Sequence, residues 1–379
     1  MSIWGQILAA VLTIAIGFCP GSGSGGDAAR KTGVSRCLVI GYDDFVTMPD
    51  TAPCSANNAE IMTSLFLDFV PAVKTVVRRV NEPGTVGGLE TLIRETFGAA
   101  ENGDTCYLYL STHGVVWDEE GETRMALMLS DGETEDALTP GRLQGILDGI
   151  PGDKVLILDA CHSGAVADAI TAPEYMVLAS CAAEEDSFFW FTDNAKEAGT
   201  GYFTTALEGA LRASYPEQID PDGNGEITRT ETLNRLASLY GASRVRGSSG
   251  ERVLFFLPEK RQTRERILGL AFDMPIREED TLILPFHFEV TEETRLEYRI
   301  IPKRNGRWDF ADYATTPDRE RTGTVRGLLS PGTKDRKIRI TASNLGAEGE
   351  ALLQIISLRG LHGQIPVLEG TRVITGGDE

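Results

Sequence analysis

Two apolar stretches in the first half of the chain each stop at a polar, reactive residue that is followed closely by glycine. Residues 107–111 run into His113 and Gly114, and residues 154–159 run into Cys161. Apolar runs of this length, without regular polar alternation, are typical of buried strands in a parallel sheet. Open α/β sheets place their functional sites at the carboxyl ends of such strands, so we expect His113 and Cys161 to meet there.

Other apolar segments alternate between strand and helix patterns as far as residue 258. Apolar residues at helical spacing predict the helices, one of which begins with Thr139 as N-cap before Pro140. A charged hairpin is expected over residues 117–131. Strands that alternate with helices predict a mostly parallel α/β sheet flanked by helices, with right-handed crossovers. The expected strands are residues 37–41, 73–80, 107–111, 154–159, 175–180 and 252–257, and the expected helices are 56–69, 86–100, 202–214, 231–240 and one starting at 139.

The pattern changes after residue 258. A charged connector at residues 260–266 is followed by short segments of alternating apolar and polar residues, such as 296–300 and 337–341. Alternation of this kind between Pro/Gly turns is typical of an antiparallel β-sandwich. We therefore divide the chain into an N-terminal segment with a Gly/Ser linker (1–33), an α/β domain (34–258), a linker (259–270) and a β-sandwich-like C-terminal domain (271–379).

The composition limits what kind of protein this is. With 379 residues, of which 41% are hydrophobic and 24% charged, it has the balance of a soluble globular protein with two or three domains. The net charge of −20 argues against general nucleic-acid binding, which needs a basic surface. The acidic balance either attracts basic peptides or cations, or is simply a solvated surface. The six cysteines show no zinc-binding spacing, and we expect no organic cofactor.

The N-terminus carries an apolar segment at residues 3–18, followed by Cys19 and by a Gly/Ser-rich stretch at residues 20–26. The apolar segment is short for a membrane span but fits the core of a signal peptide. The residues before Cys19 loosely resemble a lipoprotein cleavage site, and the Gly/Ser stretch is typical of a flexible tether. We expect an exported protein, either secreted or tethered to the membrane of a bacterial cell envelope, with an unprocessed hydrophobic anchor as the alternative.

A thiol and an imidazole at one edge of a sheet suggest a nucleophile and its general base. Cys161 would attack as a thiolate, and His113 would move protons to and from the leaving group. The two residues are 48 positions apart, which is close to the ~50 of the caspase pattern. The structural alternative is a buried cysteine with a core histidine, and the matched positions of both residues at strand ends argue against it.

The residues around these two strand ends closely resemble the metacaspase and bacterial caspase-like (C14-type) branch of the caspase-clan cysteine peptidases. The resemblance covers roughly residues 36–258, and it is carried by His113-Gly114 together with Asp159-Ala160-Cys161-His162-Ser163-Gly164. It implies a caspase-like fold and endopeptidase activity on peptide or protein substrates, with the N–H groups of Gly114 and Cys161 as the oxyanion hole. His162 is interpreted as a loop residue of the motif and not as the base.

The resemblance also bears on substrate preference. True caspases bind a substrate aspartate with arginines and with a glutamine two places before the nucleophile, whereas metacaspases that take basic residues have an aspartate there. This chain has Asp159, and a carboxylate attracts Arg or Lys and repels Asp, so cleavage after Arg or Lys is implied. Metacaspases carry a second acid where this chain has Asn58, so Asp43 and Asp44 are candidates for the missing charge. A less strict, clostripain- or legumain-like preference and a purely structural Asp159 are the alternatives.

The residues from 220 to 231 match a complete twelve-residue EF-hand loop, which makes a calcium ion the one cofactor we expect. Its oxygen ligands would be Asp220, Asp222, Asn224, the carbonyl of Glu226, Thr228 through a water molecule, and bidentate Glu231. The alternative is an Asp/Gly turn that caps the following helix, because bacterial caspase-like domains often show a similar turn before their last helix.

Two classes of function remain open at this point. The first is an active cysteine endopeptidase. The second is a catalytically idle scaffold or adhesin, whose β-rich domain binds a partner of unknown identity. The presence of both His113 and Cys161 favours the first.

Overall fold

The computed structural model describes most of the chain after residue 32. The described residues are 33–48, 54–191, 198–213, 216–239, 244–247, 251–258, 267–291, 294–308, 322–324, 329–359 and 363–375. The expected signal segment and tether at 1–33 lie outside them except for Gly33, as does the connector at 260–266, so export and tethering stay predictions. Across the described ranges, no helix combines the length and the apolar character that a membrane crossing requires.

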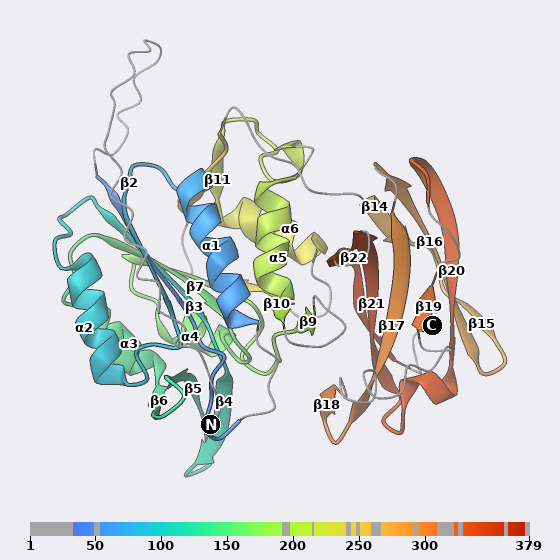
Figure 1. Cartoon of the computed structure of the whole chain (residues 1–379), viewed down its shortest axis with the longest axis horizontal. Coiled ribbons are helices and arrows are strands. Elements are labelled where there is room, and N and C mark those ends of the chain that lie inside the picture. The colour runs from blue at the N-terminus through green and yellow to red at the C-terminus, as the bar shows by residue number, and fades with distance from the viewer. Residues whose placement is uncertain are drawn as a thin grey trace, which may run out of the picture.

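A six-stranded sheet forms the centre of the N-terminal half (Figure 1). In spatial order its strands are β12 (Arg246–Gly247), β8 (Tyr175–Ala179), β7 (Asp153–Asp159), β3 (Thr105–Ser111), β1 (Ser35–Gly41) and β2 (Val73–Val80). The five longer strands are parallel, and the short β12 runs antiparallel to β8. The strands β1, β3 and β7 are buried along nearly their whole length, which explains their continuous apolar sequences. The predicted mostly parallel α/β sheet is therefore confirmed.

Helices cover both faces of this sheet (Figure 1). On one face lie α1 (Ser55–Phe69), α5 (Tyr202–Leu211) and α6 (Arg229–Leu239), and on the other lie α2 (Val86–Phe97), α3 (Pro140–Leu147) and α4 (Gly164–Ala169). The hydroxyls of Thr85 and Thr139 accept backbone N–H groups and so cap α2 and α3, with Pro140 in the first turn of α3 as predicted. Each face of the sheet is thus closed by its own apolar cluster.

Short strands extend from the carboxyl edge of the sheet. β4 (Gly114–Glu119), β5 (Glu122–Ser130) and β6 (Glu135–Leu138) form a small antiparallel sheet directly after β3. The expected hairpin turn is present at Glu120 and Gly121, both of which have positive φ. β9 (Phe189–Phe191) and β10 (Gly199–Gly201) pair with each other between β8 and α5. Both additions border the edge at which His113 and Cys161 lie.

The strand expected at residues 252–257 forms, but it does not join the main sheet. β13 (Val253–Phe256) instead pairs antiparallel with β11 (Glu226–Thr228), which follows the short 3₁₀ helix η1 (Pro216–Gln218). The sheet edge beside β8 is taken by β12. An apolar run predicts an extended segment but not its partner, which here depends on the loop at 220–231 bringing β11 alongside.

Two antiparallel sheets form the C-terminal domain, as the alternating pattern predicts (Figure 1). One contains β14 (Ile267–Phe272), β15 (Ile276–Glu278), β16 (Thr281–Val290) and β20 (Gly332–Thr341), and the other contains β17 (Arg295–Arg304), β18 (Arg307–Trp308), β19 (Thr322–Thr324), β21 (Glu350–Arg359) and β22 (Gly363–Thr375). The 3₁₀ helix η2 (Ala342–Leu345) connects β20 to β21. Apolar side chains from both sheets form one core, which is the arrangement of a β-sandwich.

The two halves of the molecule share apolar packing. β22 lies against α5 and α6. Ile301 and Leu352 of the sandwich belong to the same buried cluster as the apolar side chains of α1, α5 and α6. The β-sandwich therefore packs directly on the helical layer that covers one face of the main sheet.

Candidate active site

The two strand ends that were expected to carry chemistry lie side by side. β3 and β7 are neighbours in register, so that Ser111 is opposite Asp159 at their ends. His113 and Cys161 each follow two residues later, at the same edge of the sheet. Gly114 lies against the nucleophile segment, because a Cβ built on it would be only 1.7 Å from the carbonyl oxygen of Cys161. The structure therefore brings His113, Gly114 and Cys161 together.

The His113 ring has apolar and acidic neighbours. The Phe45 ring packs edge-on against it, with 4.8 Å between the two ring centroids. Burial lowers the pKa of His113 from its usual value of 6.5, while the negative charges of Asp43 and Glu135 act in the opposite direction. A neutral imidazole is the form that can accept a proton, so these surroundings suit a general base near neutral pH.

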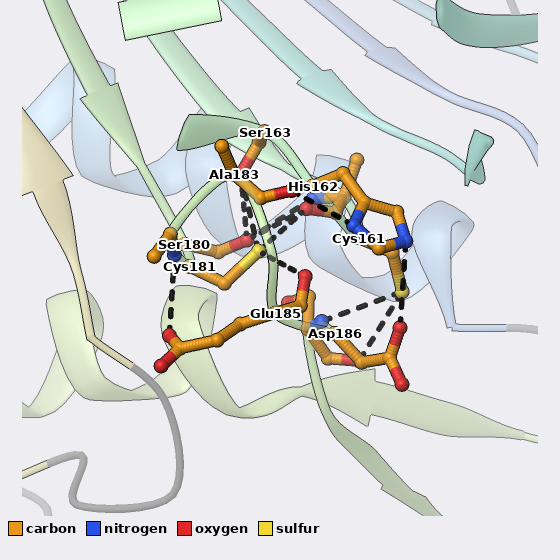
Figure 2. Close-up of polar contacts among 11 residues, drawn as sticks. Cys161, His162, Ser163, Ser180, Cys181, Ala183, Glu185 and Asp186 are labelled. Carbon is orange, nitrogen blue, oxygen red and sulfur yellow. Dashed lines mark hydrogen bonds and ion pairs between the residues drawn. The ribbon is translucent and has the colours of Figure 1, made fainter. Parts of the chain in front are cut away.

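The Cys161 thiol is half-buried and faces the segment that follows β8 (Figure 2). The backbone N–H of Ser187 donates to its Sγ at 3.3 Å, and the Ser187 carbonyl oxygen lies 3.8 Å from the same sulfur. Burial raises the pKa of the thiol strongly, and the charge of Asp186 raises it further. Among the residues that the structure describes, no hydrogen bond joins the His113 ring to this sulfur. This is a resting thiol, which must lose its proton before it can act as a nucleophile.

His162 has a left-handed backbone conformation, with a φ of 60°, and its ring faces the segment after β8 (Figure 2). Its Nδ1 lies 3.0 Å from the carbonyl oxygen of Ala183, and its Nε2 lies 3.7 Å from Oδ1 of Asp186. Its backbone N–H donates to the carbonyl of Glu185 at 2.9 Å. His162 therefore fastens this segment to the residues around the nucleophile.

Asp159, at the end of β7, is buried among hydroxyl and amide groups. Its carboxylate accepts hydrogen bonds from the hydroxyls of Ser187 at 2.8 Å and Thr204 at 2.7 Å, and Nδ2 of Asn58 lies 3.4 Å away. The side-chain oxygen of Asn58 accepts the backbone N–H of Gly201 at 2.8 Å. Burial raises the pKa of Asp159, and the two hydroxyls act against this shift. The structure thus places Asp159 and Asn58 together next to the start of α5.

The other two acids proposed for substrate binding have different surroundings. The carboxylate of Asp43 accepts the three backbone N–H groups of residues 54–56 at 2.7–2.9 Å, at the start of α1, where helix donors lack partners. Asp44 is exposed, and its carboxylate lies close to Gly132 in the turn between β5 and β6. Neither carboxylate is hydrogen-bonded to Asp159 or Asn58 within the part of the chain that the structure describes.

Sequence reasoning did not single out Asp186, Ser187 or Cys54 as neighbours of the nucleophile. Asp186 and Ser187 follow β8, the strand beside β7, so the rule about carboxyl ends of parallel strands would have pointed to this segment too. Cys54 lies at the start of α1, and its pKa is raised by burial and by the nearby Asp43, among other groups. No sequence signal places Cys54 there. The five cysteines that the structure describes are all free thiols.

The expected calcium loop lies between η1 and α6. One carboxylate oxygen from each of Asp220, Asp222 and Glu231 lies within 4.8 Å of the other two. Asp220 is buried, Asp222 is exposed and Glu231 is intermediate, so the cluster opens toward solvent on one side. Carboxylate and carbonyl oxygens are the ligands that calcium prefers, so the residues present fit such an ion.

Hydrogen bonds hold this loop in shape. The backbone N–H of Asn224 donates to Asp220 at 3.1 Å, and the Asn224 side chain accepts the N–H of Glu226 at 2.6 Å. Glu231 accepts both the N–H and the hydroxyl of Thr228 at 2.8 Å, just before α6 begins. These contacts are compatible with a calcium loop and also with a turn that caps the helix.

A family comparison identifies the α/β domain. The sequence model of the caspase domain (Peptidase C14) matches residues 34–237, more than half of the chain. Among solved structures, the chain is similar to a protein from Geobacter sulfurreducens (14% identity, TM-score 0.42, covering 61% of this chain and 100% of that one). It is also similar to caspase-1 from Spodoptera frugiperda (14% identity, TM-score 0.37, covering 56% and 82%). No curated protein matches the chain. Because the family match covers most of the α/β domain, the chain belongs to the caspase domain family of peptidases.

Proposed function

We propose that the protein is a cysteine endopeptidase in which Cys161 and His113 act as a catalytic dyad. The observation that carries this proposal is their position at the paired ends of β3 and β7, with Gly114 packed on the Cys161 backbone. Membership of the caspase domain family supports it independently. Catalytic hydrogen bonds are often long before substrate binds, so the lack of a direct bond from His113 to the sulfur is compatible with this role.

In this mechanism His113 takes the proton of the Cys161 thiol, and the thiolate attacks the carbonyl carbon of the scissile peptide bond. The backbone N–H groups of Gly114 and Cys161 stabilise the oxyanion of the tetrahedral intermediate, at roughly 3 kcal/mol for one donor. The C–N bond then breaks, and His113 gives the proton to the leaving amine. Water hydrolyses the thioester, which releases the second product and restores the thiol.

We further propose that the enzyme cleaves after Arg or Lys, with Asp159 as the recognising acid. A buried carboxylate with a raised pKa gains from a cationic partner, because the opposite charge offsets the cost of burial. The hydroxyls of Ser187 and Thr204 occupy its oxygens, so a substrate cation must share or displace these bonds. Asp43 and Asp44 remain candidates for additional negative charge, although the Asp43 oxygens are engaged at the start of α1.

The dyad is tested with Cys161→Ala, His113→Ala and the double variant on fluorogenic peptides. Each single variant should abolish turnover, and the double variant should be no worse than either, because the two residues act as one unit. A cysteine-reactive peptide probe should label wild-type protein at Cys161. Peptidase activity above a trace in Cys161→Ala would reject the proposal.

A catalytically idle scaffold is the second candidate, and two features of Cys161 favour it. The Cys161 thiol has a raised pKa, and it has no hydrogen bond to His113 among the described side chains. In that case the β-sandwich would bind a partner and the caspase domain would support it. The peptide probe separates the two candidates, because a scaffold would show no selective labelling of Cys161.

We also propose that the loop before α6 binds a calcium ion through Asp220, Asp222, Asn224, the Glu226 carbonyl and Glu231. The support for this is the convergence of three carboxylates within 4.8 Å in a loop with EF-hand spacing. An ion there would join the loop to the start of α6 and raise thermal stability by mass action. For an exported protein, an affinity as weak as ~10⁻⁴–10⁻³ M would be sufficient.

A further inference from the structure

A carboxylate that the proposed mechanism does not use lies beside the nucleophile. Figure 2 shows the Asp186 side chain pointing toward the Cys161 sulfur and the His162 ring. The charge of Asp186 acts on the Cys161 thiol, and its Oδ1 lies 3.7 Å from Nε2 of His162. The hydrogen bonds of the thiol run to the backbone of Ser187, so Asp186 acts on the sulfur through its negative charge.

The segment that carries Asp186 is fastened to the nucleophile at several points. The N–H of Ser187 donates to the Cys161 sulfur at 3.3 Å, and the N–H of His162 donates to the carbonyl of Glu185 at 2.9 Å. Nδ1 of His162 lies 3.0 Å from a backbone carbonyl, which can only accept, so this nitrogen carries the hydrogen. The opposite nitrogen faces Asp186, and the two groups form an ion pair when the imidazole is protonated.

We infer that the carboxylate of Asp186 holds Cys161 in a resting, poorly nucleophilic state through its negative charge beside the thiol, with the hydrogen bonds of the segment after β8 keeping it in place. The inference rests on the proposed role of Cys161 as the nucleophile. To become a thiolate, the sulfur must acquire a negative charge next to that of the carboxylate, which disfavours ionisation. A substrate or partner that moves the segment after β8 would separate Asp186 from the sulfur and restore reactivity.

The other acids described in the segment after β8 are paired elsewhere. Glu184 and Glu185 belong to the same segment, but both are paired with Arg244. After burial, the charge of Asp186 is the largest cause of the raised thiol pKa, ahead of Cys181. Among the described residues, the other titratable groups around the thiol are His113 after β3, Asp159 at the end of β7, Cys54 at the start of α1, and Asp43, which follows β1 and accepts the first N–H groups of α1. Asp186 is therefore the acid whose removal should change Cys161 most.

The test measures the alkylation rate of Cys161 against pH, and it does not depend on peptide hydrolysis. Full-length protein is treated with iodoacetamide over a pH series, and the modified Cys161 peptide is quantified by mass spectrometry with Cys54 as internal reference. Asp186→Asn keeps the side-chain shape and removes the charge. The pH at which the alkylation rate of Cys161 reaches half its maximum should therefore fall by about one pH unit. The thiolate fraction at neutral pH then rises about tenfold, and the lower nucleophilicity of a more acidic thiol leaves alkylation about threefold faster.

Three further variants make the result specific. Asp186→Glu keeps the charge and should restore most of the wild-type profile, whereas Asp186→Ala should reproduce the shift if the Asn variant does not fold. Glu184→Gln removes an exposed carboxylate from the same segment and should leave the profile unchanged. An unchanged midpoint in Asp186→Asn or Asp186→Ala, or an equal shift in Glu184→Gln, would overturn the inference.

The outcomes also separate this inference from the proposed peptidase activity. If wild-type protein hydrolyses no peptide but Asp186→Asn shifts the alkylation profile, the proposed function fails and the control of the thiol by Asp186 stands. If peptides are hydrolysed and the Asp186→Asn profile is unchanged, the proposed function stands and the inference fails.

Discussion

Replacing Gly114 by alanine tests whether its close contact with the nucleophile segment is needed. The added Cβ would lie 1.7 Å from the carbonyl oxygen of Cys161 and 2.7 Å from its carbonyl carbon. Since real Cβ atoms essentially never approach within 3.0 Å, the two backbones would have to move apart by about 1.3 Å. Neither backbone segment can move easily. Gly114 begins β4, and Cys161 follows β7, which is an inner strand of the main sheet.

The size of the effect follows from this geometry. Overpacking of a tightly packed site costs about 1–3 kcal/mol of folding free energy. In a domain of this size, each kcal/mol corresponds to about 2–4 °C in melting temperature, so a fall of about 2–12 °C is expected. The effect on turnover should be larger, because a displacement of about 1 Å at an active site can cost about 100-fold in rate.

The two measurements are thermal unfolding and kcat/KM on the best fluorogenic peptide. Gly145 on α3 is the matched control, because it is exposed and a Cβ there meets nothing within 4 Å. Helix propensity predicts that Gly145→Ala stabilises the protein by up to about 1 kcal/mol and leaves turnover unchanged. A Gly114→Ala variant with wild-type melting temperature and near-wild-type kcat/KM would refute the reasoning, since the clash would then be relieved without moving Cys161.

Three more results are expected. On peptides that differ only in the residue before the scissile bond, Arg or Lys should be preferred over Asp, and Asp159→Asn should erase the margin; preferred cleavage after Asp would contradict the assignment. Calcium should raise the melting temperature, and Glu231→Gln should remove this effect, whereas Glu217→Gln, at an exposed position, should retain it. If calorimetry detects no heat of calcium binding, the proposed site is wrong. Because burial lowers the pKa of His113, the unfolded chain binds its proton first as pH falls, so the free energy of unfolding should decline just below pH ~6.5. Denaturant titrations should show that the free energy of unfolding of His113→Gln falls less steeply over this pH range. A wild-type protein that became more stable on acidification would contradict a lowered pKa of His113.

The position of the chemistry could be predicted from local patterns. The apolar runs before His113 and Cys161 predicted that both would leave the sheet at one edge, and the pairing of β3 with β7 confirms this. The prediction succeeds because parallel neighbours bring their carboxyl ends together whatever the intervening loops do. Asp159 and Asn58 were paired by their resemblance to family motifs, and their side chains do meet.

What could not be predicted depends on contacts between distant segments. Ser187 and Thr204 bond to Asp159 from 28 and 45 residues away, and no periodic pattern encodes either contact. The contacts of a charged residue such as Asp43 are equally difficult to predict from the sequence. A sequence shows an acid near a strand end, but only the folded chain shows that its oxygens bind the first N–H groups of α1.

The packing of the β-sandwich on the helical layer has a consequence for how such a protein can evolve. Ile301 and Leu352 share one apolar cluster with the helices that cover the caspase sheet, and β22 lies against α5 and α6. A continuous apolar interior cannot be divided without leaving one side in water. Recombination that exchanged the C-terminal domain would have to supply matching apolar side chains opposite these helices. A replacement domain without such side chains would leave the apolar faces of these helices in water, which is not the case for modules joined only by a linker.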